Sequence, residues 1–184
     1  MAHTTSLRLF IVVVSLTGSC TSASPSPTRD DEATVIRQAL EDEFASLSQR
    51  DTLFVSSRLD ARTAHEGDFA QWLDALLPEQ FRHGVSRDLF LRFWQANKRV
   101  RTIRLPATLA GVWIEPLEAG PELALPADGG RYSVSRVGLT AAADSALVSV
   151  QFACRGLCGQ MDLYLYVRRP NGWTRAWHLV ALSN

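Results

Sequence analysis

The sequence predicts a domain of the α+β class, with N-terminal helices packed on a C-terminal antiparallel meander sheet of four to five strands. In the first half of the chain, apolar residues recur at helical spacing. From Thr108 onward, short runs of alternating apolar and polar residues are separated by turn residues. The 184 residues suit an export signal (1–19), a tether (20–30) and a single α+β domain (31–184).

Residues 1–19 have the three parts of a signal peptide, which are a positive start, an apolar centre of about 7 to 15 residues and small residues before the cut. Arg8, the apolar run 9–16 and the pair Gly18-Ser19 occupy these places. The run is shorter than the roughly 20 residues that cross a bilayer. We therefore expect cleavage of this segment during export.

The segment from Leu16 to Cys20 resembles the lipobox of bacterial lipoproteins, in which a Leu-led tripeptide of small residues precedes the acylated cysteine. The resemblance implies a membrane lipid attached through Cys20. The match is imperfect, because Leu16 lies one position early and Thr17 takes the usual Leu position. The alternative is ordinary secretion with cleavage near Ala23. Both alternatives place the domain outside the cytoplasm, either membrane-anchored or secreted or periplasmic.

Residues 20–30 form the predicted tether, because small polar residues and prolines leave little to bury. A helix over about 31–48 follows. Its first turn is acidic, which complements the helix dipole, and apolar residues recur at helical spacing. The apolar positions are Ile36, Leu40, Phe44 and Leu47. A short extended piece is expected over Thr52–Val55.

Two further helices are expected before the sheet. Pro78 ends the first, and Ser86 is the N-cap of the second. Their apolar stripes favour core packing over a ligand box. The stripe residues are Phe69, Trp72, Leu73 and Leu76 in the first helix and Leu89, Phe90, Phe93 and Trp94 in the second.

Five strands are expected in the second half of the chain. Pro170-Asn171-Gly172 predicts a tight hairpin, because Asn-Gly tolerates the positive φ angles of such turns. Residues 115–131, rich in Pro and Gly, are expected to form a long loop. The predicted strands are Leu109–Ile114, Tyr132–Leu139, Ala146–Cys154, Leu163–Arg168 and Trp173–Leu182.

The strand around residues 163–168 carries apolar or aromatic side chains on both faces. Leu163 and Leu165 point one way, and Tyr164 and Tyr166 point the other way. This pattern predicts a central place in the sheet, with the helices covering one side. His178 alternates with Trp177 on the last strand, so the two side chains point to opposite faces.

The layout of helices followed by a meander is reminiscent of NTF2-like or cystatin-like domains. From residue 135 onward the chain contains S-R-V-G, A-L-V, C-R-G-L-C-G and N-G-W in that order. This order resembles a family of uncharacterised exported bacterial proteins. The resemblance implies fold and location and transfers no catalytic residue. Gln160, Met161 and Asp162 depart from the family pattern after the second cysteine, so the loop before them is expected to differ in shape.

Composition excludes several classes of function. The formal net charge is +0, which gives no bulk attraction to nucleic acid or anionic lipid. Lys98 is the only lysine, and no serine stands three residues before it, so a Ser-Lys mechanism has no support. Phosphate-binding, dinucleotide-binding, G-x-S-x-G and Ca²⁺-loop motifs do not occur. No cofactor and no metal are expected.

Cys154 and Cys158 form an even pair in an oxidising compartment, so a disulfide that staples the loop is expected. Its five-residue ring is worth about 2 kcal/mol by loop entropy. The alternatives are a redox pair and a metal site. The spacing is one residue longer than C-x-x-C, and no nearby ligand completes a zinc site.

Two other polar groups can be explained without a functional site. The first group consists of His65, Glu66 and Asp68, with His83 further along the chain. Its acids suit the first turn of a helix, and the alternative is metal binding or acid–base catalysis. The second group consists of Lys98, Arg99, Arg101 and Arg104. These cations suit the C-terminal end of a helix, and the alternative is an anion-binding site.

These observations predict an exported, lipid-anchored cell-envelope protein that acts as a non-catalytic binding or interaction domain. One alternative is a small-molecule enzyme with a pocket on the concave sheet face, in which Tyr164 or Tyr166, His178 and an acid converge. A second alternative is thiol redox chemistry at Cys154 and Cys158.

Overall fold

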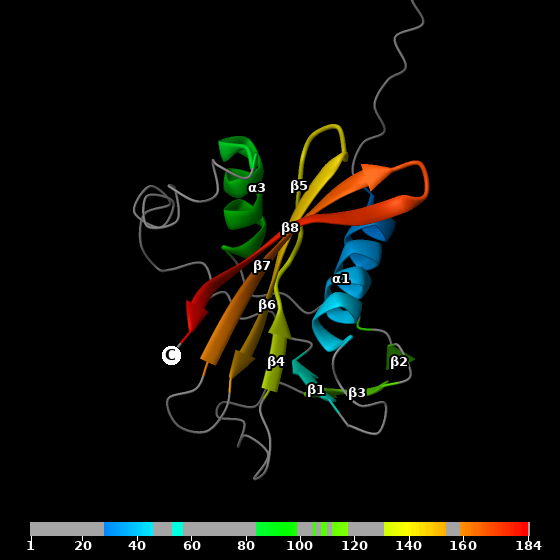
Figure 1. Ribbon diagram of the computed structural model, residues 1–184, viewed down its shortest axis with the longest axis vertical. Coiled ribbons are helices and arrows are strands. Elements are labelled where there is room, and N and C mark those ends of the chain that lie inside the picture. Colours follow the sequence, from blue (N-terminus) through cyan, green and yellow to red (C-terminus); the bar gives the residue numbers. More distant parts are fainter. Residues whose placement is uncertain are drawn as a thin grey trace, which may run out of the picture.

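The computed structural model describes residues 28–45, 53–56, 84–98, 105, 108–109, 112–117, 131–153 and 159–183. These residues form two helices and a sheet, which confirms the α+β class (Figure 1). The helices are α1 (Arg29–Phe44) and α3 (Arg87–Asn97). The strands are β1 (Leu53–Ser56), β2 (Thr108–Leu109), β3 (Val112–Leu117), β4 (Arg131–Val134), β5 (Gly138–Leu139), β6 (Ser145–Ala153), β7 (Gly159–Arg169) and β8 (Gly172–Ser183).

The sheet has the order β2-β3-β1-β4-β6-β7-β8, and β5 pairs with β6. Strands β4 to β8 pair antiparallel, as expected of the meander. Strand β1 instead pairs in parallel with both β3 and β4. The extended segment predicted near residue 53 is therefore β1, which lies in the sheet between β4 and β3 and so pairs β3 and β2 with the C-terminal strands.

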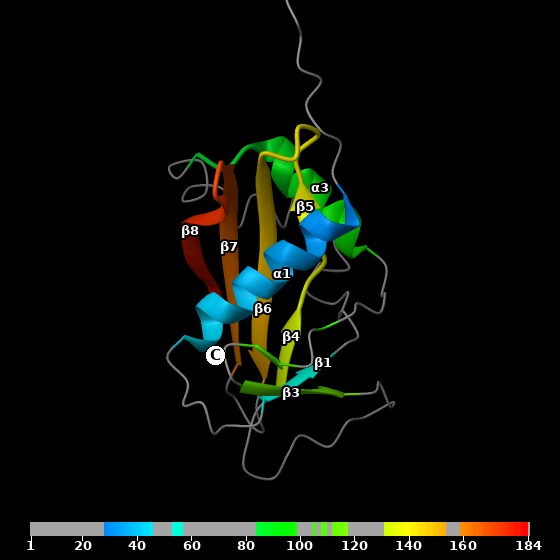
Figure 2. The same ribbon diagram turned by 90° about the vertical axis from the view of Figure 1, so that its right-hand side faces the viewer.

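The two described helices cover opposite faces of the sheet, so the expectation that the helices cover one side is wrong. Figure 2 shows α1 crossing one face in front of β6, and Figure 1 shows α3 on the opposite side. The reason is the two-faced character of the central strands. On β6, Val148 packs with α1 residues such as Leu40, whereas Leu147 packs with α3 residues such as Phe90. Each face needs its own apolar cover.

Side-chain caps fix both helix starts. Ser86 is the N-cap of α3 as predicted, and its Oγ accepts from Leu89 N at 3.2 Å. Helix α1 has a capping box in which Thr28 is the N-cap and Asp31 is the N3 residue. The helix thus begins two residues before the predicted start and ends at Phe44, short of residue 48.

Helix α3 buries Leu89, Phe90 and Phe93, as expected, while Trp94 is only partly buried. Asn97 is buried instead. Its Nδ2 donates to the carbonyls of Phe93 and Arg136 at 2.8 and 3.0 Å, and its Oδ1 accepts from Arg136 N at 2.8 Å. A buried amide satisfied in this way joins the end of α3 to the backbone between β4 and β5.

The predicted strand Tyr132–Leu139 is divided into β4 and β5. Ser135 explains the break, because its Oγ accepts from Ser149 N at 2.8 Å in place of a backbone carbonyl. Likewise, the predicted strand Leu109–Ile114 is divided into β2 and β3. The predicted loop over 115–131 is wrong at its two ends, which belong to β3 and β4, and residues 118–130 lie outside the described part.

The β7–β8 hairpin lies where the sequence predicts it, but its turn is different. Arg169 pairs with Gly172, so the loop consists of Pro170 and Asn171. Gly172 has φ of 116°, whereas Asn171 is not among the positive-φ residues. The ring of Pro170 favours the first central position of an ordinary β-turn, and this moves the left-handed position onto the glycine after the loop.

Several predictions fall outside the described residues. These are the signal, most of the tether, Cys20, the helix containing Phe69, Trp72, Leu73 and Leu76, and the loop with Cys154 and Cys158. No helix among the residues that are described is both long and apolar enough to cross a membrane.

Gly138 packs directly against α3. A Cβ added there would lie 2.5 Å from the Cα and N of Phe93, so Gly138→Ala forces β5 and α3 apart. We expect a loss of about 3 kcal/mol of unfolding free energy, measured by urea denaturation.

Gly159→Ala is the matched control, because its nearest contact would be an ordinary 3.7 Å to the Phe152 carbonyl. We expect it to change stability by less than about 1 kcal/mol. Equal losses in the two variants would contradict the close approach of β5 to α3.

Candidate functional site

Strand β7 presents a column of polar side chains to the face that α1 covers. Side chains alternate along a strand, so every second residue shares this face. The paired residues of β6 on the same face are apolar, from Phe152 to Ala146. Helix α1 therefore packs its apolar residues against β6, while three of its acidic residues, Asp31, Asp42 and Glu43, reach β7. The column consists of Gln160, Asp162, Tyr164, Tyr166 and Arg168.

Three pairs of side chains join α1 to this column, and we call them the α1–β7 seam. Asp31 contacts Arg168 at the start of the helix. At the end of the helix, the Tyr166 hydroxyl donates to Asp42 Oδ2 at 2.7 Å, and the Tyr164 hydroxyl donates to Glu43 Oε2. The seam thus runs along the whole length of α1.

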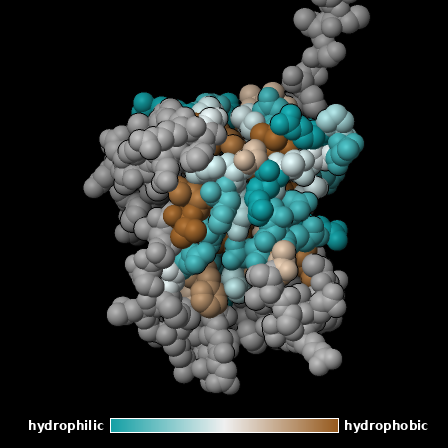
Figure 3. All heavy atoms as spheres, viewed as in Figure 1, coloured by the Kyte–Doolittle hydropathy of each residue, from teal (hydrophilic) through white to brown (hydrophobic). Residues whose placement is uncertain are grey.

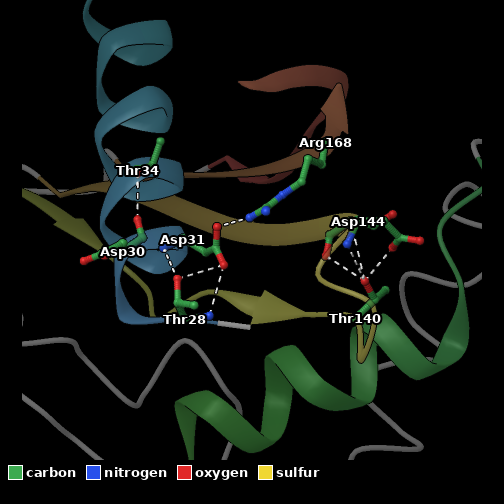
Figure 4. Close-up of polar contacts among 8 residues, drawn as sticks. Thr28, Asp30, Asp31, Thr34, Thr140, Asp144 and Arg168 are labelled. Atoms are coloured by element: carbon green, nitrogen blue, oxygen red, sulfur yellow. Dashed lines mark hydrogen bonds and ion pairs between the residues drawn. The ribbon is translucent and has the colours of Figure 1, made fainter. Parts of the chain in front are cut away.

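The N-terminal end of the seam fixes the point where the chain enters the domain. Figure 4 shows Asp31 between Thr28 and Arg168. Its backbone N donates to Thr28 Oγ1 at 3.2 Å, and its Oδ2 accepts from Thr28 N at 3.0 Å. The guanidinium of Arg168 also lies over the ring of Trp173, 4.7 Å from the ring centroid. This end is explained by helix capping and ion pairing.

The C-terminal end of the seam continues into a larger group, which we call the acid–tyrosine cluster. It adds a pair between β7 and β8, in which His178 Nε2 lies 2.7 Å from Asp162 Oδ1. The imidazole also stacks on the ring of Tyr164. The ring centroids are 4.7 Å apart, and the angle between the ring planes is 15°. The cluster consists of Asp42, Glu43, Asp162, Tyr164, Tyr166 and His178.

A bulge in β8 completes the cluster. Leu165 pairs with Trp177, but Tyr166 pairs with Arg175, so Ala176 is the extra residue. In a regular strand, Arg175 and Trp177 are two residues apart and would share the α3 face. The bulge moves Arg175 to the α1 face, where its Nη1 lies 3.7 Å from Asp42 Oδ2.

Burial differs sharply within the Asp162–His178 pair. The Asp162 side chain is 3% exposed and the His178 side chain is 39% exposed. The second carboxylate oxygen of Asp162 accepts from Gln160 Nε2 at 2.6 Å. A buried carboxylate with a hydrogen bond on each oxygen therefore orients an imidazole that solvent can reach.

The described surface seen in Figure 3 is mainly hydrophilic, with apolar residues in separate patches.

Burial raises the pKa of the Glu43 carboxyl, and the nearby charge of Asp162 raises it further. The bond from Tyr164 and the charge of His178 act in the opposite direction but are weaker overall. Burial and the bonds to carboxylates also raise the pKa of both Tyr164 and Tyr166. Both tyrosines therefore stay protonated at neutral pH and act as donors.

The structure brings the predicted pocket residues together. Tyr164, Tyr166 and His178 lie on one face, because Trp177 packs on the α3 side. The sequence predicts an acid beside them but does not indicate which one. The acids are Asp42, Glu43 and Asp162.

Two signals in the sequence point to these acids. Residues 41–43 are all acidic at the end of α1, where the helix dipole disfavours negative charge. Asp162 interrupts a run from Met161 to Val167 whose other residues are apolar or aromatic. Both features break a local rule, and such breaks often mark functional sites.

Other predicted site residues lie outside the described part of the chain, so their roles stay predictions. They are Cys20, His65, Glu66, Asp68, His83, Arg99, Arg101, Arg104, Cys154 and Cys158. Of the predicted basic group only Lys98 is described, and its Nζ lies 3.7 Å from the ring centroid of Trp94. This contact is a cation–π interaction at the end of α3.

Within the described ranges, no three His, Cys, Asp or Glu side chains are grouped as metal ligands. Comparison with protein families, with curated proteins and with solved structures finds no match to this chain. The acid–tyrosine cluster is therefore the feature from which a function can be inferred.

The bond between Tyr166 and Asp42 can be measured by a double-mutant cycle with Tyr166→Phe and Asp42→Asn. Tyr166 is fully buried, and its partner is a carboxylate, so we expect a coupling energy of about 1–2 kcal/mol in urea denaturation. The Arg175 contact with Asp42 is lost both in Asp42→Asn and in the double variant. It therefore cancels in the coupling energy, which reports the bond between Tyr166 and Asp42. Additive effects of the two changes would show that the hydroxyl does not hold α1.

Proposed function

We propose that the chain is an exported, lipid-anchored cell-envelope domain that binds a ligand at the acid–tyrosine cluster. The observation that carries the proposal is the exposed imidazole of His178 on the buried carboxylate of Asp162. Around it lie tyrosine donors and two carboxylates at the end of α1. This mixture of donors, acceptors and charge is typical of the polar part of a binding site.

A purely structural role accounts for only part of the cluster. The two tyrosine–carboxylate bonds hold α1 to the sheet. The Asp162–His178 pair, in contrast, lies within β7 and β8 and connects neighbouring strands that are already paired. Burying a carboxylate costs free energy, and an apolar residue would pack at this position without that cost. A ligand that uses the oriented imidazole explains why Asp162 is there.

The anchoring part of the proposal rests on the lipobox-like segment and on where α1 starts. Thr28 and Asp31 fix the start of the domain. An extended chain spans at most about 3.5 Å per residue, so the segment between Cys20 and Thr28 would hold the domain within roughly 30 Å of a bilayer. A domain held there suits a binding role at the envelope.

Acylation is tested by metabolic labelling of the full chain with radioactive palmitate in a bacterial host. We expect wild type to carry label and partition into membranes, and Cys20→Ala to lose both properties, because the thiol is the attachment point. Cys154→Ser is the matched control and keeps its label. Equal labelling of wild type and Cys20→Ala would refute acylation at that residue.

Ligand binding is tested by thermal-shift screening of the mature protein against a small-molecule library, followed by calorimetry. We expect His178→Gln and Asp162→Asn to weaken a hit by about tenfold or more, or at least about 1.4 kcal/mol. Arg37→Gln is the control, because Arg37 is 61% exposed and, among the described residues, its ion pair is with Glu41 along α1. If no hit distinguishes the cluster variants from this control, the cluster is not the site.

Acid–base catalysis is a second candidate, favoured by the same pair. A carboxylate that accepts from Nε2–H leaves Nδ1 of the neutral imidazole as a proton acceptor. Product analysis of the binding mixtures decides between the two functions. Turnover that disappears in His178→Gln would favour the enzyme. Redox chemistry at Cys154 and Cys158 stays a prediction that no described residue bears on.

A further inference from the structure

Glu43 sits at the point where the last turn of α1 meets the sheet. It lies next to Phe44, which is buried and packs edge-on against Tyr132 at 4.7 Å. The neighbouring turn residue Glu41 points elsewhere and pairs with Arg37 at 3.0 Å. Of these two glutamates, only Glu43 bonds to the sheet, through Tyr164.

Negative charge accumulates around Glu43 from α1, which carries Asp42, and from β7, which carries Asp162, while β8 contributes the basic residues Arg175 and His178. Because the C-terminal end of a helix carries partial negative charge, the dipole of α1 adds to it. The charge of Glu43 together with that of Asp162 also contributes to a raised pKa at Tyr132, after burial. The facing titratable or charged groups are Asp42 on α1, Tyr132 on β4, Asp162, Tyr164 and Tyr166 on β7, and Arg175 and His178 on β8.

We propose that Glu43 is an acid-sensitive catch: the last turn of α1 docks on β7 more tightly when this carboxyl is protonated and is released more readily when it is charged. Protonation removes one charge from a crowded, half-buried position and leaves a carbonyl oxygen that accepts from Tyr164. Release returns the carboxylate to water and uncovers the side of Tyr164 that α1 covers.

The direction of the pH effect follows from the sign of the shift. Below about 4.5, the ordinary value, Glu43 is protonated in both the docked and the released turn, so its titration does not affect docking. Above the raised pKa of the docked state, the carboxyl is charged in both states, and the docked state carries the full desolvation penalty. Docking therefore weakens as the pH rises from about 4.5 through that raised pKa.

The catch does not depend on the ligand proposal. Its effect on binding does depend on that proposal: if the cluster binds a ligand, the pH outside the cell would control access of the ligand to Tyr164 and His178. The two ideas can fail separately, because the catch is measured without ligand and binding is measured at one pH.

The test is amide hydrogen exchange of residues 41–44 in the mature protein from about pH 4, below the ordinary pKa of a glutamate, to about pH 8, corrected for intrinsic exchange rates. We expect the protection of these amides to fall severalfold across this range, because the charged carboxyl carries the desolvation penalty only in the docked turn. Glu43→Gln should remove this dependence, because glutamine accepts from Tyr164 without titrating. Glu41→Gln, in the same turn, should retain it.

His178→Gln separates the carboxyl from the imidazole. We expect this variant to keep the pH dependence, although its midpoint shifts upward because a cation that lowers the pKa of Glu43 is lost. Flat protection in wild type, or an unchanged dependence in Glu43→Gln, would overturn the catch. A dependence that vanishes only in His178→Gln would assign the sensor to the imidazole and overturn it as well.

A direct titration covers the case in which Glu43→Gln does not fold. The side-chain carboxyl carbon of Glu43 in the wild-type protein is followed by nuclear magnetic resonance. We expect a titration midpoint above 4.5. A midpoint at or below that value would overturn the proposal.

Discussion

The requirement that β7 be covered on both faces controls most of this structure. Every residue from Met161 to Tyr166 is buried. The alternate residues that point to the α1 face are nevertheless polar. A buried polar group has to be hydrogen-bonded or it destabilises the fold. Neighbouring β6 offers only apolar side chains on that face, so the partners come from α1, from Gln160 within β7 and from β8. Helix position, strand register and the cluster are thus aspects of one constraint.

The two ends of α1 meet this requirement in opposite electrostatic conditions. Asp31 lies at the positive end of the helix dipole, caps the helix and contacts Arg168, so all three interactions agree in sign. Asp42 and Glu43 lie at the negative end, where no residue of the last turn is basic. They are held by tyrosine hydroxyls and by Arg175 at 3.7 Å. The acidic start needs only a structural explanation, whereas the acidic end is where structure and chemistry overlap.

Much of the fold followed from local rules. The helices around residues 31–44 and 87–97 follow from apolar spacing, and Ser86 marks a start that the structure confirms. Two-faced apolar character predicted a central place in the sheet for the strand containing Leu163 and Tyr164; β7 is paired and covered on both sides, but it lies next to the edge strand β8 and not at the centre. Local rules did not predict the division at Ser135, where a side chain replaces a backbone carbonyl across to β6. They also did not predict the turn at Pro170, because two residues there each favour a different turn.

Local sequence patterns are sufficient to predict the α+β class, the alternation that places Tyr164 and Tyr166 on one face, and the opposite orientation of His178 and Trp177. These are properties of residues close together in the chain, which strand geometry alone controls. The tertiary structure decided that α1 and α3 take opposite faces, and that Asp42 and Glu43 meet β7 across more than a hundred residues. It also decided, through the bulge at Ala176, that Arg175 joins them. A helix crossing and a one-residue shift in register depend on how whole elements pack, and no local pattern encodes them.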